Sequence, residues 1–207
     1  AKPLFFLDYF ACGRLDGDVA EAVIAGIAEG CRRARCALVG GETAEMPGFY
    51  ADGEYDLAGF SVGMVDRDRV IDGRHAAVGD VILGIPSTGL HSNGYSLARK
   101  VLLGDEEAVD LAAEVPALGR SLADELLEPT AIYVDAVNAL RAAVEPKAFV
   151  HVTGGGLIDN PPRVVRDELA WEFDATRWEV PAVMRLIAEK AQVSLFEMRR
   201  TFNMGLG

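Results

Sequence analysis

Cysteine is scarce in this sequence, and the few copies present exclude a disulfide scaffold. The 207 residues include three cysteines, at positions 12, 31 and 36, an odd number without the spacing of a metal site. We therefore expect reduced, structural thiols and a cytoplasmic protein. No apolar run approaches the roughly 20 residues that a membrane-spanning helix needs, and no charged-then-apolar leader opens the chain. We expect neither a membrane partner nor export.

Positive charge is also in short supply. The chain has 20 Lys and Arg residues against 32 Asp and Glu residues, which gives a net charge of −12 at pH 7. Nucleic acids and anionic membranes are bound through basic surfaces, so neither is an expected partner. A phosphate ligand would have to be met by backbone N–H groups, a helix N-terminus or a bridging cation. The sequence contains neither a Walker loop nor the Gly-x-Ser-x-Gly elbow of hydrolases.

The residues that are abundant predict a globular protein of mixed α/β architecture. Half of the chain is apolar, and 22 residues are glycine. Apolar residues recur every three or four positions over 16–34, which predicts an amphipathic helix between two short apolar strands. In full, we predict strands at 4–8, 36–39, 55–65, 81–86, 149–152 and 169–173, and further helices at 94–102, 130–143 and 180–190.

Two domains are expected, because a polar segment with a turn signal divides the chain. The segment 67–80 carries Asp72-Gly73, and the alternation of strands and helices restarts after it. We therefore predict an N-terminal α/β domain over 1–68 and a C-terminal α/β domain over 69–207. Both ends read as cut within longer elements, so we expect an incomplete N-terminal domain and a C-terminal domain without its last elements.

Two adjacent glycines, an acid and a hydroxyl follow directly after a predicted buried strand, as Gly40, Gly41, Glu42 and Thr43. Such glycines would let a phosphate or a metal ion approach the backbone, and Glu42 could hold Mg²⁺ together with phosphate oxygens. Asp8 ends another apolar strand, so its carboxylate needs a cation, an arginine or a helix N-terminus as a partner. The alternatives are a tight turn with solvated acids and a purely structural pairing of Asp8.

Two further segments combine glycine with polar side chains. His91 lies in a polar loop, where its ordinary pKa near neutrality suits proton transfer or contact with a phosphate; a solvated loop histidine is the alternative. Ser92, Asn93 and Gly94 precede a predicted helix, whose first N–H groups would point outward. The segment 153–156 would present consecutive N–H groups as an anion-binding nest. Its residues are Thr153, Gly154, Gly155 and Gly156.

Five segments in one order form a more specific pattern than any single glycine loop. They are Leu-Phe-Phe-Leu-Asp-Tyr-Phe-Ala (4–11), Gly-Gly-Glu-Thr-Ala-Glu-Met-Pro-Gly (40–48), His-Ser-Asn-Gly-Tyr-Ser-Leu (91–97), His-Val-Thr-Gly-Gly-Gly (151–156) and Arg-Thr-Phe-Asn (200–203). Together they resemble the phosphoribosylformylglycinamidine cyclo-ligase family, also called aminoimidazole ribonucleotide synthetase, and the likeness covers essentially the whole chain.

The resemblance implies a two-domain aminoimidazole ribonucleotide synthetase-like fold and a homodimer. It also implies an ATP-dependent cyclisation of formylglycinamidine ribonucleotide in purine biosynthesis, with ATP and Mg²⁺ bound. By motif, Asp8 and Glu42 are candidate metal ligands, and His91 and Asp8 are candidate catalytic residues. The residues that the resemblance assigns to phosphate binding are Gly40, Gly41, Glu42, Thr43, Ser92, Asn93, Gly94, Thr153, Gly154, Gly155 and Gly156.

The chain departs from the family pattern at its start. Family members carry a preceding Gly-Thr-Asp-Gly-Val-Gly-Thr-Lys run and further aspartates that bind nucleotide, and this sequence begins after them. We therefore expect this polypeptide to be inactive alone. Two alternatives stay open: another ATP-using member of the same superfamily, and a non-catalytic remnant that serves binding or dimerisation.

Overall fold

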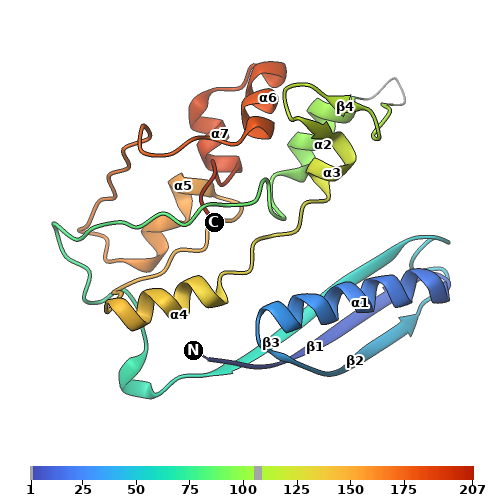
Figure 1. The fold of residues 1–207 in the computed structure, drawn as a ribbon, viewed down its shortest axis with the longest axis horizontal. Helices are drawn as coiled ribbons and strands as arrows, with labels where there is room; N and C mark the ends of the chain where they lie inside the picture. Colours follow the sequence, from blue (N-terminus) through green and yellow to red (C-terminus); the bar gives the residue numbers. More distant parts are fainter. Residues whose placement is uncertain (1, 105–108) are drawn as a thin grey trace. The chain divides into compact units, whose positions relative to one another are not determined.

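The computed structural model describes residues 2–104 and 109–207, and the chain divides into two compact units (Figure 1). The first unit consists of Ala1–Val70 and Ile132–Glu145, and the second of Ile71–Ala131 and Pro146–Gly207. The architecture is mixed α/β, as predicted. The predicted division into 1–68 and 69–207 stays a prediction. In this structure the segment 132–145 groups with the first unit.

The first unit is built on a three-stranded sheet. Its strands are β1 (Lys2–Cys12), β2 (Ala37–Glu45) and β3 (Tyr55–Met64), in the order β2-β1-β3. Helix α1 (Gly17–Arg33) connects β1 to β2, which pair in parallel, and β3 pairs with β1 in the antiparallel sense. All three predicted strands and the predicted helix of this region are confirmed, and each strand is longer than or close to its predicted span.

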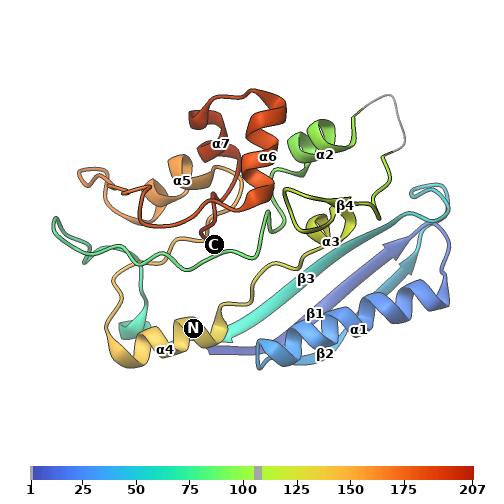
Figure 2. The same ribbon diagram turned by 45° about the horizontal axis from the view of Figure 1, so that its top comes forward.

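Helix α1 begins and ends where elementary helix chemistry favours it. The carboxylate of Asp16 accepts hydrogen bonds from the N–H groups of Asp18 and Val19 at 3.0 and 3.2 Å, which satisfies two free donors of the first turn. Arg32 and Arg33 lie in the last turn, where positive charge offsets the helix dipole. The helix packs on one face of the sheet (Figure 2).

The two faces of the sheet differ in their cover. Side chains alternate along β1, so Asp8 and Phe10 share the face of α1, where they are 9% and 2% exposed. Leu7 and Tyr9 point to the opposite face, where Phe60 of the partner strand β3, the residue paired with Leu7, is 63% exposed. Among the described residues of the first unit, no helix covers this opposite face, which we call the open face.

Helix α4 (Val134–Ala143) also belongs to the first unit. An ion pair joins Arg35, just after α1, to Asp135 of α4 at 3.0 Å. A short 3-10 helix, η1 (Arg67–Arg69), follows β3. The predicted helix at 130–143 is therefore confirmed, but it begins four residues later than predicted and packs with the first unit.

The second unit is mainly helical. Its elements are α2 (Tyr95–Leu103), β4 (Glu114–Val115), β5 (Arg120–Ser121), α3 (Leu122–Leu126), α5 (Gly156–Asp159), η2 (Pro161–Val164), α6 (Ala182–Ala191) and α7 (Leu195–Thr201). The core lies where α2, α6 and α7 meet, around Ala98, Met184, Ile187, Met198 and Phe202, each at most 1% exposed. The predicted helices at 94–102 and 180–190 are confirmed.

Three strands predicted for the second unit are wrong. Residues 81–85, 149–152 and 169–173 lie in no strand, although Pro86 forms an isolated bridge with Leu206. Val81 and Leu83 are 83% and 63% exposed, so the segment that was expected to be buried faces solvent. A strand requires a neighbouring strand to complete its hydrogen bonds, and an apolar run specifies no such partner.

Candidate functional site

His91 is buried in the loop before α2. It is 4% exposed, and its backbone adopts a left-handed conformation with φ 59°. Its Nε2 accepts hydrogen bonds from the N–H groups of Thr88 at 3.1 Å and Ala131 at 3.4 Å. The imidazole thus ties its own loop to the segment that precedes α4, and the alternative of a solvated loop histidine is wrong.

Burial and a neighbouring histidine disfavour the charged form of His91. Burial lowers the pKa of the imidazole below its ordinary 6.5, and the nearby charge of His151 lowers it further. A ring nitrogen that accepts hydrogen bonds carries no proton, so the neutral ring has its proton on Nδ1. His91 is therefore a neutral group that holds the neighbouring backbone in place. Its Nε2 could accept a proton only if the N–H groups of Thr88 and Ala131 gave up their hydrogen bonds to it.

The structure brings together two of the predicted segments, 91–94 and 153–156. The Oδ1 atom of Asn93 accepts a hydrogen bond from the N–H of Gly154 at 3.0 Å, and Ser92 Oγ lies 3.1 Å from Thr130 Oγ1. Gly94 has φ 77°, and a methyl group there would overlap the ring of Phe202. The bond between Asn93 and Gly154 holds the loop before α2 against the glycine loop before α5, and the other two contacts fix the first loop against Thr130 and Phe202.

The N–H groups of 153–156 do not form an open anion nest. Each donates within the chain: Thr153 to Asn160 Oδ1 at 2.7 Å, Gly154 to Asn93, Gly155 to the carbonyl of Arg200 at 3.0 Å, and Gly156 to the carbonyl of Thr153 at 2.9 Å. The prediction that these amides point at a phosphate is wrong for this structure. The hydroxyls of Ser92, which shares a hydrogen bond with Thr130, and of Thr153 are candidates for contact with a ligand.

Two buried asparagines organise these loops and were assigned no role from the sequence. Asn160 is 4% exposed, and it both accepts from Thr153 and donates to the carbonyl of Gly154 at 3.3 Å. Asn203 is 1% exposed; its Oδ1 accepts from Ser87 Oγ at 3.0 Å and Gly205 N at 2.8 Å, and its Nδ2 donates to a loop carbonyl. The one signal for Asn203 was its place in the Arg-Thr-Phe-Asn segment.

In the first unit, the sheet register separates Asp8 from Glu42. Asp8 pairs with Gly41 and lies on the face of α1, whereas Glu42 pairs with Tyr9 and lies on the open face, where it is exposed. Thr43 shares the face of Asp8, and Gly40 shares the face of Glu42. The two carboxylates are therefore not brought together.

The sequence predicts that a phosphate or a metal ion approaches the backbone at Gly40 and Gly41. In the structure, the carboxylate of Asp8 lies closest to Gly41. A methyl group at Gly41 would overlap the carboxylate of Asp8, so a glycine is required here for a side chain of the neighbouring strand. The same carboxylate lies near the buried thiol of Cys31 on α1, whose pKa is raised by burial and then by the charges of Cys36 and Asp8.

The carboxylates fit a metal ion only in part. Within residues 2–104 and 109–207, no three His, Cys, Asp or Glu side chains are grouped so that they could hold a metal. Mg²⁺ bound with a nucleotide needs only one or two carboxylates, because phosphate oxygens and water complete its shell. Glu42, exposed on the open face, fits that single-carboxylate role.

The fold and these loops define an AIR synthase related protein. The AIR synthase related C-terminal domain matches residues 77–207 and the corresponding N-terminal domain matches residues 1–65, so the chain belongs to this family. Relatives named phosphoribosylformylglycinamidine cyclo-ligase match the whole chain. Those from Burkholderia cenocepacia strain HI2424 and Anaeromyxobacter dehalogenans strain 2CP-1 are 53% and 57% identical over 207 and 208 residues. The predicted resemblance is confirmed.

The chain spans 58% and 59% of the length of these two relatives. Among solved structures, thiamine-monophosphate kinase from Stenotrophomonas maltophilia is similar over 99% of this chain and 59% of its own, with a TM-score of 0.65 and 22% identity. AaThiL complexed with AMPPCP and TMP gives a TM-score of 0.51 at 19% identity. Both likenesses concern the fold. No described helix is long and apolar enough to span a membrane.

Proposed function

We propose that this chain carries part of an ATP-dependent cyclo-ligase that converts formylglycinamidine ribonucleotide to aminoimidazole ribonucleotide in purine biosynthesis. The observation that carries the proposal is the 53% and 57% identity to two proteins named for this activity, over the whole chain. In this reaction ATP phosphorylates the formyl oxygen, the neighbouring amidine nitrogen attacks the same carbon, and the oxygen leaves as phosphate. The products are ADP, phosphate and the closed ring.

The residues of the second unit would act by positioning. The hydroxyls of Ser92 and Thr153 are the candidates for contact with phosphate, and the hydrogen bond from Gly154 to Asn93 fixes the distance between their loops. His91 would hold the first of these loops through its bond with Thr88. Such positioning converts binding energy into the correct alignment of reacting groups.

In the first unit, Glu42 would bind Mg²⁺ and Asp8 would support the strand beside it. The ion, when bound, neutralises charge on the phosphates of ATP. Asp8 is 9% exposed beneath α1, and its carboxylate lies directly against Gly41, the residue next to Glu42. Its part in catalysis would thus be indirect.

A chimera tests this function. The matched segment of the Burkholderia cenocepacia relative would be replaced by this chain, which is 53% identical to it over 207 residues. We expect turnover, measured as ADP release that depends on the amidine ribonucleotide. Glu42→Gln, which removes a charge at constant shape, should lower the rate at least about a hundredfold, or about 2.7 kcal/mol.

Glu54→Gln is the matched control for that substitution, because Glu54 is exposed on the loop before β3. It should leave the rate unchanged. A chimera that folds but releases no ADP with the ribonucleotide would refute the proposed function, and an active chimera insensitive to Glu42→Gln would remove only the role of Glu42.

We further propose that a second copy of the chain covers the β3 side of the open face and leaves Glu42, on β2 at the other edge of the sheet, accessible. Phe60 and Val62 of β3 are 63% and 38% exposed there, beside the half-buried Phe5 and Leu7 of β1. Apolar residues grouped on one sheet face favour burial against a partner surface.

The free thiols of Cys12, Cys31 and Cys36 are compatible with a reducing compartment, and we propose the cytoplasm.

Phe60→Lys should convert the dimer to a monomer in sedimentation velocity experiments, because it places an uncompensated charge in the contact. Phe196→Lys is the control, since Phe196 of α7 in the second unit is also a largely exposed phenylalanine, at 58%. A wild-type chain that sediments as a monomer at every concentration, or a dimer that persists with Phe60→Lys, would contradict this dimer.

A further inference from the structure

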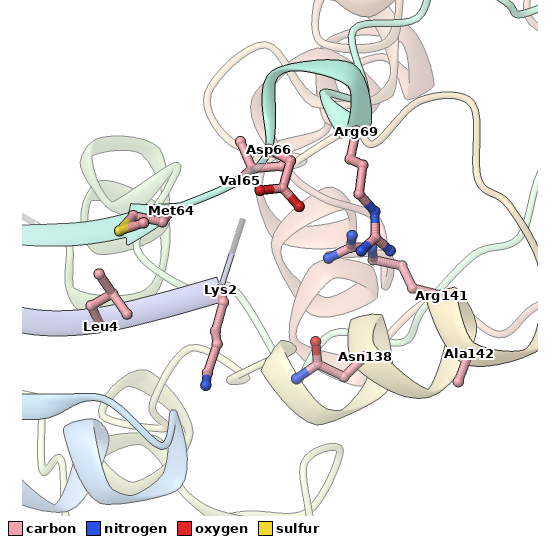
Figure 3. Close-up of a pocket in the computed structure, with 9 residues that line it drawn as sticks. All are labelled: Lys2, Leu4, Met64, Val65, Asp66, Arg69, Asn138, Arg141 and Ala142. Atoms are coloured by element: carbon pink, nitrogen blue, oxygen red, sulfur yellow. The ribbon is translucent and has the colours of Figure 1, made fainter.

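A pocket of about 480 Å³ lies in the first unit, away from the segments considered so far (Figure 3). Three parts of the chain line it: the beginning of β1, the end of β3 with the residues that follow it, and α4. Its volume falls in the range of sites for small molecules. None of the residues that the sequence analysis assigned to a site contributes to its wall.

Positive charge is concentrated in this pocket. Lys2, Arg69 and Arg141 line it together with a single carboxylate, that of Asp66. Figure 3 shows the side chains of Arg69 and Arg141 pointing toward one another from different elements. Within the described part of the chain, neither arginine forms a salt bridge, whereas many arginines elsewhere do.

Two guanidinium groups that point toward one another repel each other, and an anion placed between them would relieve that repulsion. The excess of cations is also unexpected in a chain whose net charge is −12. Guanidinium groups recognise phosphate oxygens through paired N–H donors, so two of them suit a phosphate group. A phosphate monoester carries a charge of about −1.5 to −2 at pH 7, which matches a lining of three cations and one acid.

The rest of the lining is apolar or neutral. Leu4, Met64 and Val65 contribute exposed apolar surface, at 38%, 68% and 42%, and Asn138 contributes an amide. An apolar wall next to a cationic end favours a ligand that is itself apolar beyond its charged group. We propose that this pocket binds a phosphorylated small molecule with an apolar or aromatic body, with the phosphate between Arg69 and Arg141.

The test is a titration of the 207-residue chain with phenyl phosphate and with inorganic phosphate at constant ionic strength, followed by NMR. We expect saturable shifts of the Met64 methyl and Asn138 amide signals, and a dissociation constant for phenyl phosphate at least about tenfold lower than for inorganic phosphate, because the ring covers the apolar wall. Shifts centred on Gly94 and Gly154, or no saturation at millimolar phenyl phosphate, would overturn the proposal.

Arg69→Gln and Arg141→Gln should each weaken phenyl phosphate binding at least about tenfold, since each removes charge-assisted hydrogen bonds to the phosphate. Arg99→Gln is the control, because Arg99 is an exposed arginine on α2 of the second unit, and it should change nothing. The two test residues lie on different elements, so a folding defect in one variant leaves the other as the test. Unchanged affinity in a folded variant of either arginine would refute the site.

Discussion

Replacement of Gly156 by alanine is expected to destabilise the second unit by about 4 kcal/mol. Gly156 has φ 55°, a left-handed conformation that costs other residues about 1–2 kcal/mol. A methyl group there would also overlap the carbonyl of Arg199 and lie 2.8 Å from the carbonyl of Phe202. Both carbonyls belong to the end of α7, where Phe202 is fully buried, so the backbone cannot retreat without disturbing the core, at a further cost of about 1–3 kcal/mol.

Urea unfolding followed by tryptophan fluorescence measures the free energy of unfolding of the second unit. Both tryptophans of the chain, Trp171 and Trp178, belong to that unit. The control is Gly119→Ala. Gly119 has φ 67° with no atom within 4 Å of the added methyl group, so it isolates the backbone cost of about 1–2 kcal/mol. Equal losses in the two variants would show that the packing against α7 is not tight.

Local patterns in the sequence predicted the helices and the first sheet well. The periodicity of residues 16–34 and the Asp16 cap define α1, and the apolar runs around it define β1 and β2. Segments such as 81–85 have the same apolar character but form no strand, since a strand depends on a partner elsewhere in the chain. The elements that were missed are short: α3, α5 and α7 have five, four and seven residues.

The position of Glu42 shows why a site is harder to predict than the elements that carry it. Phe6 pairs with Leu38, and an unbroken register would place Glu42 opposite Phe10, on the same face as Asp8. The pairing shifts between Phe6 and Leu7, so Glu42 pairs with Tyr9 and points to the open face. A one-residue shift exchanges the faces of every following side chain, and no local pattern in the sequence announces it.

The anion nest failed for a similar reason. The segment 153–156 has the glycines that a nest requires, but its N–H groups find acceptors that lie far away along the chain, on Asn93 and Arg200, or nearby on Asn160. Only the folded chain brings these acceptors into reach. The resemblance assigns both the histidine loop and the glycine loop to phosphate binding, and the folded chain joins the two through the bond from Gly154 to Asn93.

Replacement of His91 by alanine is expected to cost about 3 kcal/mol of stability in the second unit. The change leaves the N–H groups of Thr88 and Ala131 without their acceptor in a partly buried place, and each such loss costs about 1–3 kcal/mol. His91→Gln should cost about 1 kcal/mol, because its amide oxygen can occupy the position of Nε2. Fluorescence-detected urea unfolding again supplies the measurement, and equal losses for the two substitutions would contradict the acceptor role.

The same pair of proteins, wild type and His91→Gln, gives a dependence on pH with a definite sign. Burial and the neighbouring His151 lower the pKa of His91 in the folded state, so below pH 6.5 the unfolded chain takes up a proton that the folded chain refuses. Stability therefore falls as the pH drops through and below 6.5, by at most about 1.4 kcal/mol per pH unit from this residue, and it is fully present above that pH. His91→Gln should lose this slope, and identical slopes in the two proteins would refute the buried neutral imidazole. Introduced into the active chimera, His91→Gln separates the two roles that His91 could have: retained turnover would assign it to the positioning of its loop, and a loss of turnover without a comparable loss of stability would assign it to proton transfer.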